Sequence, residues 1–282
     1  MKKQVASVCM CVIIIALLMS CSHVENTKIY VISREEGSGT RSSFSELFGV
    51  VDENGTDAIF GGAEKVTSTA TVISTVVGVR NAIGYISISA LNDSIKGLNI
   101  DNVSPTVENI RDGKYKLSRP FNLCFREGEI SAVANDFLEF IMSMQGEKII
   151  SESGYIPTNS EGGDYVPRGY EGKITISGSS SVSPLIEKLR DLYRQVNPNV
   201  EIEVQQTGSG AGIQSASVGV CDIGMSSRNL EESELEYLKS IKIADDGIVV
   251  IVNKENPINN ISSPNVKNIY LGITDDWAEV MD

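Results

Sequence analysis

Apolar positions in the first half of the chain follow two periods, one typical of strands and one typical of helices. Residues 28–33 and 82–87 form short, largely apolar runs, which predicts buried strands. Residues 70–80 and, most clearly, 130–151 carry apolar side chains at helical spacing. The apolar face of the longer helix is expected to contain Val133, Phe137, Phe140, Ile141 and Met144.

Residues 160–172 interrupt this pattern. They are rich in glycine and charge and have no period, so we interpret them as a linker. The alternation then restarts with a strand at 173–177, a helix with Pro184 at its first position and a half-buried strand at 200–204. The apolar run at 248–252 is typical of a central strand. Strands that alternate with helices predict an α/β fold with largely parallel sheets.

Residues 1–20 have the pattern of a secretory signal peptide, with a basic start, a short apolar stretch and a small residue before Cys21. The apolar stretch is short for a membrane span. Residues 18–21 resemble the lipobox of bacterial lipoproteins, which implies that Cys21 is lipidated. An uncleaved N-terminal anchor is the alternative. Both interpretations predict an extracytoplasmic protein that is anchored to the bacterial cell membrane.

The chain has 24 basic and 37 acidic residues and a formal net charge of −13 at pH 7. Because nucleic-acid affinity depends on clustered Lys and Arg, this balance argues against a nucleic-acid partner. A small anion would have to be held by local dipoles and hydrogen bonds. The single histidine, His23, lies close to Cys21, which argues against a histidine base or metal ligand. We therefore expect no metal and no cofactor.

Two cysteines, Cys124 and Cys221, remain after the signal segment and the lipidated residue are set aside. In an oxidising compartment they can form a disulfide, but buried free thiols are also common. The sequence leaves both states open.

Four turns of Gly, Ser and Thr each follow a predicted strand and precede a predicted helix, at 34–40, 178–182, 207–210 and 224–228. Small residues allow close approach of the backbone, and helix N-termini present unpaired N–H groups with partial positive charge. Such turns suit a tetrahedral oxyanion. None of them has the P-loop pattern. Each turn alone can equally be a helix cap or a linker.

The first of these turns lies in the run VISREEGSGTR at 31–41, which resembles the signature of the phosphate-binding proteins of bacterial phosphate ABC transporters. Residues 176–182, 205–210 and 221–228 are similar to three further loops of that family. The resemblance implies a two-lobed, periplasmic-binding-protein-like (type II) α/β fold. It also implies a receptor that binds inorganic phosphate and delivers it to the permease and ATPase of the transporter.

The resemblance also implies which residues bind phosphate. Arg34 would clamp the anion, and Ser227 stands where some members of the family carry an Asp. An Asp repels a fully ionised anion and a Ser does not, so selectivity for phosphate over sulfate is left open. The full set of expected phosphate ligands is Arg34, Ser38, Gly39, Thr40, Ser181, Val182, Ser209 and Ser227.

The order of the motifs departs from the family, in which the loop at 176–182 comes first and the arginine motif later. Joining the C-terminus to about residue 24 restores the family order, which suggests a circular permutation closed by the linker. Residues 24–116 with 255–282 would then form lobe 2, and 121–248, including the linker, would form lobe 1. The hinge crossings would lie near Arg119 and Val252. A truncated tandem protein, a misplaced gene boundary and a domain-swapped assembly are alternatives.

Two other functions remain compatible with the motifs. A non-transporting phosphate sensor or surface protein can use the same fold, since fold does not determine function. A phosphohydrolase that uses a serine-rich loop is disfavoured, because the chain offers neither a second histidine nor a recognisable metal-binding cluster. We therefore expect a receptor without catalytic residues.

Overall fold

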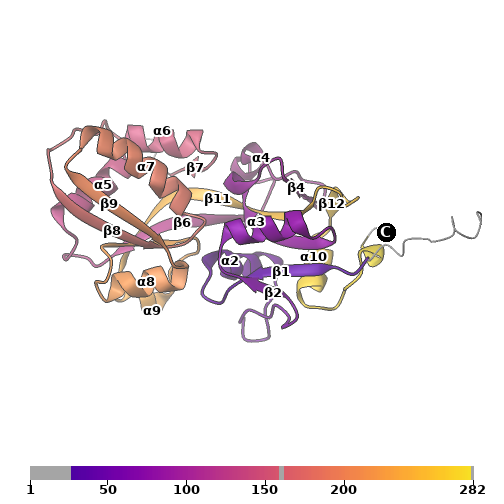
Figure 1. Cartoon of the computed structure of the whole chain (residues 1–282). Coiled ribbons are helices and arrows are strands. Elements are labelled where there is room, and N and C mark those ends of the chain that lie inside the picture. The colour runs from indigo at the N-terminus through magenta and orange to yellow at the C-terminus, as the bar shows by residue number, and fades with distance from the viewer. Residues whose placement is uncertain (1–26, 159–161, 281–282) are drawn as a thin grey trace, which may run out of the picture.

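Two α/β lobes joined by two long strands make up the structure, a computed structural model that describes residues 27–158 and 162–280 (Figure 1). Within the described residues, a sheet with the strand order β2-β1-β3-β11-β6-β10-β8-β9 passes through both lobes. None of the described helices has the length and apolar character that a membrane crossing requires. The signal segment 1–20 and Cys21 lie outside the described residues.

Lobe 2 contains parallel strands covered on both faces. Strand β1 pairs with β2 and β3 in parallel, and β3 pairs with β11 in the antiparallel direction. Helices α2, α4 and α10 cover one face, and α3 covers the other. Its elements are β1 (Tyr30–Arg34), α2 (Gly39–Phe48), β2 (Glu64–Val66), α3 (Thr69–Gly78), β3 (Ala82–Ser87), η1 (Ile88–Ala90), β4 (Ile95–Gly97), β5 (Asn99–Ile100), α4 (Val107–Arg111), β12 (Asn260–Ile261), α10 (Ser263–Tyr270) and η2 (Trp277–Glu279).

Lobe 1 repeats this layered arrangement. Strands β9, β8 and β10 are parallel, and β6 joins β10 in the antiparallel direction. Helices α5, α6 and α7 lie on one face of the sheet, and α8 and α9 lie on the other (Figure 1). Its elements are β6 (Ser118–Phe125), α5 (Ala132–Ile141), α6 (Met144–Glu152), β7 (Ile156–Pro157), β8 (Gly172–Gly178), α7 (Ser183–Val196), β9 (Val200–Gln206), α8 (Ser209–Ser217), β10 (Ile223–Ser226), α9 (Glu232–Leu235) and β11 (Lys239–Asn253), which continues into lobe 2.

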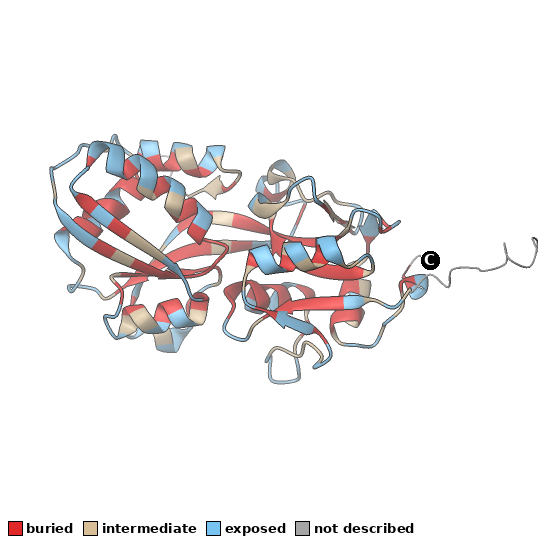
Figure 2. Cartoon of the chain, viewed as in Figure 1, coloured by how far each residue is buried: buried red, intermediate tan, exposed pale blue. Residues whose placement is uncertain are grey.

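The two crossings between the lobes are the antiparallel neighbours β6 and β11, whose middle sections are buried (Figure 2). Arg119 and Asp246 face each other there in an ion pair of 3.0 Å, and both side chains are almost inaccessible to solvent. The second crossing lies nearer Gly247 than Val252, because Val252 already pairs with β3 and belongs to the core of lobe 2.

The segment 130–151 is two helices, and the prediction of one continuous helix is wrong. Helix α5 ends at Ile141, and the hydroxyl of Ser143 caps α6 by accepting a hydrogen bond from the amide of Gly146. A Cβ at Gly146 would lie 2.2 Å from the carbonyl oxygen of Ile141. Glycine therefore allows the tight junction that turns the chain between the two helices.

Residues 162–171 contain no regular secondary structure, as expected for a linker. They nevertheless lie against lobe 1. Tyr165 packs beside Phe140, and its hydroxyl donates a 2.5 Å hydrogen bond to the buried carboxylate of Asp136. Tyr193 donates to the same carboxylate, at 2.8 Å. The described part of the linker is thus fixed to helices α5 and α7.

The first and last described residues lie side by side on lobe 2. The amide of Trp277 donates to the carbonyl of Thr27 at 2.9 Å, and the amide of Ile29 donates to the carbonyl of Asp275 at 2.7 Å. Lys28 also forms an ion pair with Asp275. The proximity of these two segments is the geometry that the proposed rejoined order requires.

Candidate functional site

The four glycine- and hydroxyl-rich loops meet where lobe 1 faces lobe 2. The loop of lobe 2 contacts all three loops of lobe 1. Thr40 and Ser181 share a hydrogen bond of 3.0 Å between their hydroxyls, and Gly210 donates its amide to the carbonyl of Gly37. Ser43 donates its hydroxyl to the carbonyl of Ser227 at 3.2 Å. Residues that are far apart in the sequence therefore form one polar cluster between the lobes.

Arg34 ends strand β1, and its side chain is 2% exposed. Its Nε and Nη2 atoms each donate a 2.8 Å hydrogen bond to the carboxylate of Glu35, and Nη2 also donates to the carbonyl of Thr67. Its Nη1 has no hydrogen-bond partner among the described residues. The guanidinium is therefore fixed on one edge and has donors available on another.

Tyr85 supports the backbone of Arg34 from the core of lobe 2. Its buried hydroxyl accepts a 3.1 Å hydrogen bond from the amide of Arg34 and shares another with the hydroxyl of Ser33. Burial raises the pKa of Tyr85 to about 12, so the phenol is protonated at neutral pH. This contact fixes the direction in which β1 leads into the loop.

The loop then turns into the N-terminus of helix α2. Ser38 is the N-cap and accepts a hydrogen bond from the amide of Arg41. Gly39 and Thr40 open the helix, so their amides belong to its unpaired first turn. Ser38 and Thr40 are both buried. The partial positive charge of the helix end thus faces the hydroxyls of lobe 1 that Gly39 and Thr40 contact.

Lobe 1 contributes a chain of hydroxyls centred on Ser227. Ser179 donates to the hydroxyl of Ser227 at 3.0 Å, and the hydroxyl of Ser209 lies 3.4 Å from it. The amide of Ser227 donates to Ser209 at 3.2 Å. All three side chains are buried. Each hydroxyl can donate to or accept from a small anion.

Gly39 fits against this cluster with no space for a side chain. A Cβ at Gly39 would lie 2.5 Å from the hydroxyl of Ser209 and 2.8 Å from that of Ser227. Real Cβ atoms do not approach other atoms so closely. The close contact of the two lobes therefore depends on glycine at this position.

The structure brings together the hydroxyls of Thr40 and Ser181 and those of Ser209 and Ser227, with Gly39 against the latter pair. Arg34 and Ser38 lie in the same loop of lobe 2, but their side-chain hydrogen bonds stay within that lobe, to Glu35, Thr67 and Arg41. Val182 differs from the others. It is the N-cap of α7, and its amide donates to the carbonyl of Ser179 at 3.2 Å. In this arrangement the amide already has a protein partner.

Two hydroxyls in the cluster were not among the predicted ligands. Ser179 lies inside the predicted loop 178–182, so the motif contained the signal for it. Thr69 opens helix α3, and its hydroxyl lies 3.3 Å from that of Ser181. The signal for Thr69 was its place directly after the N-cap Ser68 of an apolar helix.

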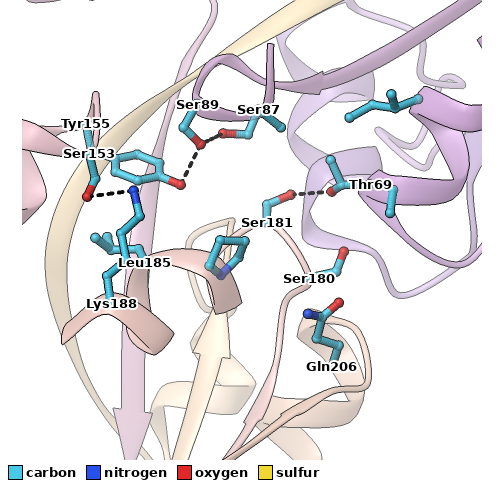
Figure 3. Close-up of a pocket in the computed structure, with 14 residues that line it drawn as sticks. Thr69, Ser87, Ser89, Ser153, Tyr155, Ser180, Ser181, Leu185, Lys188 and Gln206 are labelled. Carbon is cyan, nitrogen blue, oxygen red and sulfur yellow. Dashed lines mark hydrogen bonds between the residues drawn. The ribbon is translucent and has the colours of Figure 1, made fainter. Parts of the chain in front are cut away.

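A cavity of about 250 Å³ lies between the lobes next to Ser181 (Figure 3). Helix α3 and the end of β3 line one side, and the loop before α7 lines the other. Ser180 also lines the cavity, and its hydroxyl is buried without a hydrogen-bond partner among the described residues. Thr69 and Ser181 therefore connect the hydroxyl cluster to this cavity, whereas Ser209 and Ser227 do not line it.

The arrangement is suited to holding a small oxyanion with donors from both lobes. One helix N-terminus and several hydroxyls converge there, and the loop that leads into the helix begins at Arg34. Within residues 27–158 and 162–280, no group of three or more His, Cys, Asp or Glu side chains is placed to hold a metal ion. Cys124 and Cys221 are buried free thiols. The sequence left open whether they form a disulfide, and in this structure they do not.

The chain is similar in sequence to several known proteins. The family model described as the PBP superfamily domain matches residues 21–145 and 162–281. Phosphate-binding protein PstS 2 of Streptococcus agalactiae serotype V is 41% identical over 275 residues, 94% of this chain and 94% of the relative. Phosphate-binding protein PstS 2 of Streptococcus pneumoniae serotype 4 is 38% identical over 255 residues, 89% of this chain and 87% of the relative.

A solved structure gives the same result for the fold. The crystal structure of a phosphate-binding protein of a phosphate ABC transporter from Streptococcus pneumoniae TIGR4 matches with a TM-score of 0.72 and 38% identity. The match covers 90% of this chain and 99% of that chain. The relatives are named as phosphate-binding proteins and not as enzymes.

Proposed function

This chain belongs to the phosphate-binding proteins of the PBP superfamily, and on that basis we propose that it is an extracytoplasmic receptor for inorganic phosphate. It would pass the anion to the permease and ATPase of an ABC transporter. It binds its ligand without converting it.

The observation that carries this proposal is the meeting of Gly39 and Thr40, at the N-terminus of α2 on lobe 2, with the hydroxyls of Ser181, Ser209 and Ser227 on lobe 1. Arg34 begins the loop that leads into this helix. An anion that contacts both sides stabilises the closed arrangement of the lobes over an open one. The crossing strands β6 and β11 are the hinge between them. The transporter would recognise the closed form.

The proposed location follows from the N-terminal segment. Residues 1–20 would direct secretion, and a lipid on Cys21 would attach the receptor to the membrane. A secreted receptor that was not attached would diffuse away from its permease in a cell without an outer membrane.

We further propose that the order of the two lobes is a circular permutation. The adjacency of Thr27 and Trp277 supports it, because a rejoined chain would need a short connection there. The Streptococcus agalactiae relative aligns over 94% of both chains, so the two proteins share one order of segments.

Calorimetry of the purified protein, first freed of co-purifying anions, tests the proposed function. We expect phosphate to bind, and Arg34→Ala to weaken binding by about 100-fold, because a buried charge-assisted donor to the anion is lost. Lys114→Ala, an exposed cation paired with Asp112, is the control and should bind normally. Absence of phosphate binding in the unaltered protein contradicts the proposal. Uptake of labelled phosphate by cells with and without the protein then separates a transport receptor from a sensor.

A further inference from the structure

The cavity beside Ser181 remains although the lobes touch on both sides of it (Figure 3). On one side, the hydroxyl of Thr69 in lobe 2 lies 3.3 Å from that of Ser181 in lobe 1. On the other side, Ser89 of lobe 2 donates a 2.5 Å hydrogen bond to the hydroxyl of Tyr155 in lobe 1. The volume of about 250 Å³ therefore belongs to the arrangement in which the lobes are in contact.

One buried hydroxyl that lines this cavity lacks a partner. Ser180 is 6% exposed, and its Oγ forms no hydrogen bond among the described residues. Folded proteins rarely leave a buried hydroxyl unpaired. Ser180 is thus in place to form a hydrogen bond with a group that occupies the cavity.

The walls of the cavity suit an uncharged group that carries hydroxyls. Ser180, Ser89 and Gln206 offer donors and acceptors for such hydroxyls. Ile73 and Leu185 add apolar surface that can contact a short carbon chain. The cavity has the volume of about eight water molecules at about 30 Å³ each, so a three-carbon polyol fits within it.

A second anionic group matches these walls poorly. Among the described residues that line the cavity, Lys188 is the one with a charged side chain, and its ammonium donates a 3.3 Å hydrogen bond to the hydroxyl of Ser153. A pyrophosphate or a dicarboxylate would bring further negative charge into a protein whose formal net charge is already −13. The lining therefore favours a neutral substituent over a second anion.

Ser181 connects this cavity to the proposed phosphate site. Its hydroxyl lines the cavity and shares a 3.0 Å hydrogen bond with that of Thr40, at the N-terminus of α2. We propose that the receptor also binds phosphate monoesters of small polyols, with the phosphate in the site for inorganic phosphate and the polyol in the cavity. This inference rests on the phosphate binding proposed above.

Equilibrium dialysis with glycerol 3-phosphate that is carbon-labelled in its glycerol part tests the proposal. The label ensures that traces of free phosphate cannot imitate binding of the ester. We expect saturable binding of one ester per protein, which an excess of inorganic phosphate displaces. Pyrophosphate should bind more weakly than the ester. Absence of ester binding, failure of phosphate to displace it, or tighter binding of pyrophosphate overturns the proposal.

Ala70→Phe locates the ester group, and Val77→Phe is the matched control. Both residues lie on α3, but Ala70 lines the cavity, whereas Val77 is 46% exposed and does not line it. The phenyl ring at position 70 should fill the cavity and lower ester affinity by about tenfold or more, with phosphate affinity within about twofold of that of the unaltered protein. Val77→Phe should change neither affinity. Unchanged ester affinity in Ala70→Phe, or an equal loss in Val77→Phe, contradicts the assigned location.

Ser180→Ala gives a second measurement with a smaller change in shape. Loss of one hydrogen bond to the polyol should lower ester affinity by about threefold to tenfold and leave phosphate affinity unchanged. An equal loss for both ligands would assign Ser180 to the phosphate site and overturn its role toward the polyol. If phosphate itself does not bind, the proposed function fails. If phosphate binds and the labelled ester does not, only the proposal for the cavity fails.

Discussion

The amide of Gly210 in lobe 1 donates a 2.9 Å hydrogen bond to the carbonyl of Gly37 in lobe 2. This bond joins the turn after Arg34 to the first turn of α8. Neither residue has a side chain, so the two backbones meet directly. A hydrogen bond between the hydroxyls of Thr40 and Ser181 and another from the hydroxyl of Ser43 to the carbonyl of Ser227 flank it. The structure thus shows the lobes in contact at the level of their backbones.

Gly39→Ala should weaken phosphate binding and leave the fold intact. The added methyl group would overlap the hydroxyls of Ser209 and Ser227, so the lobes could not approach fully. We expect affinity to fall by about 100-fold or more, since lobe closure and the contacts that it brings are lost. Calorimetry measures the affinity, and small-angle X-ray scattering measures closure.

Gly61→Ala is the control for that variant, because a Cβ at Gly61 would meet no atom within 4 Å. Its affinity should match that of the unaltered protein. Normal phosphate affinity in Gly39→Ala would show that the contact between the lobes is not needed for binding.

Ser227→Asp should sharpen discrimination against sulfate. The new carboxylate would lie among the hydroxyls of Ser179 and Ser209 and would repel an anion that has no proton to donate. Calorimetry should show that sulfate affinity falls more than phosphate affinity. If both affinities fell equally, position 227 would have no part in selectivity.

Asp246→Ala should destabilise the hinge. The substitution leaves Arg119 as a buried charge without its partner, which typically costs about 3–5 kcal/mol of unfolding free energy. Urea unfolding monitored by circular dichroism gives the value. Asp112→Ala removes an exposed pair with Lys114 and should leave stability nearly unchanged, because water screens that pair. A loss at Asp246 as small as at Asp112 would contradict the importance of the buried pair.

The two thiols should resist modification in the native protein. Burial raises the pKa of Cys124 to about 12 and that of Cys221 to about 11, from an ordinary value of 9.0. Because both are raised in the folded state, their contribution to stability is complete below pH 9.0 and is lost as pH rises toward about 11 and 12. A thiol reagent should label them only in denaturant, and unfolding should become easier above pH 9.0. Rapid labelling of the folded protein would contradict this.

A reconnected chain tests the permutation. Residue 280 would be linked to residue 27 by a short flexible connection, and the chain would be opened at 159–161, where the linker begins. We expect the rearranged protein to fold and to bind phosphate with an affinity close to that of the natural order, because the described ends already lie together. If the rearranged protein failed to fold, the two orders of segments along the chain would not be equivalent, and the proposed permutation would be contradicted.

The elements predicted best from the sequence are those in which a single local pattern, such as a continuous apolar run, determines the secondary structure. The run at 82–87 is strand β3 with the predicted bounds, because all six of its residues are buried. The break between α5 and α6 escaped prediction, because apolar spacing continues across it. The break is local: Ser143 caps α6, and Gly146 fits closely against the carbonyls of Phe140 and Ile141, so the chain turns between the helices while the apolar spacing is kept.

The candidate site was also predicted only in part from the sequence. Loops that could bind an anion were recognisable from glycine and hydroxyl content, and the structure brings them together. Sequence could not show that Glu35 holds Arg34, whereas Glu36 turns outward to Lys65. Both carboxylates lie within two residues of the arginine. The direction of the chain after β1 determines which of the two carboxylates pairs with Arg34.

The core of lobe 2 has a consequence for biosynthesis. Val266, Ile269, Tyr270 and Trp277 belong to the same apolar core as Phe44 and Tyr85. A ribosome therefore makes the first part of this lobe long before the residues that complete it, whereas lobe 1 is contiguous in the chain. Until the last turns emerge, lobe 2 lacks part of its apolar core and cannot reach full stability. A polypeptide that has to be threaded through a secretion channel in an unfolded state gains from this delay.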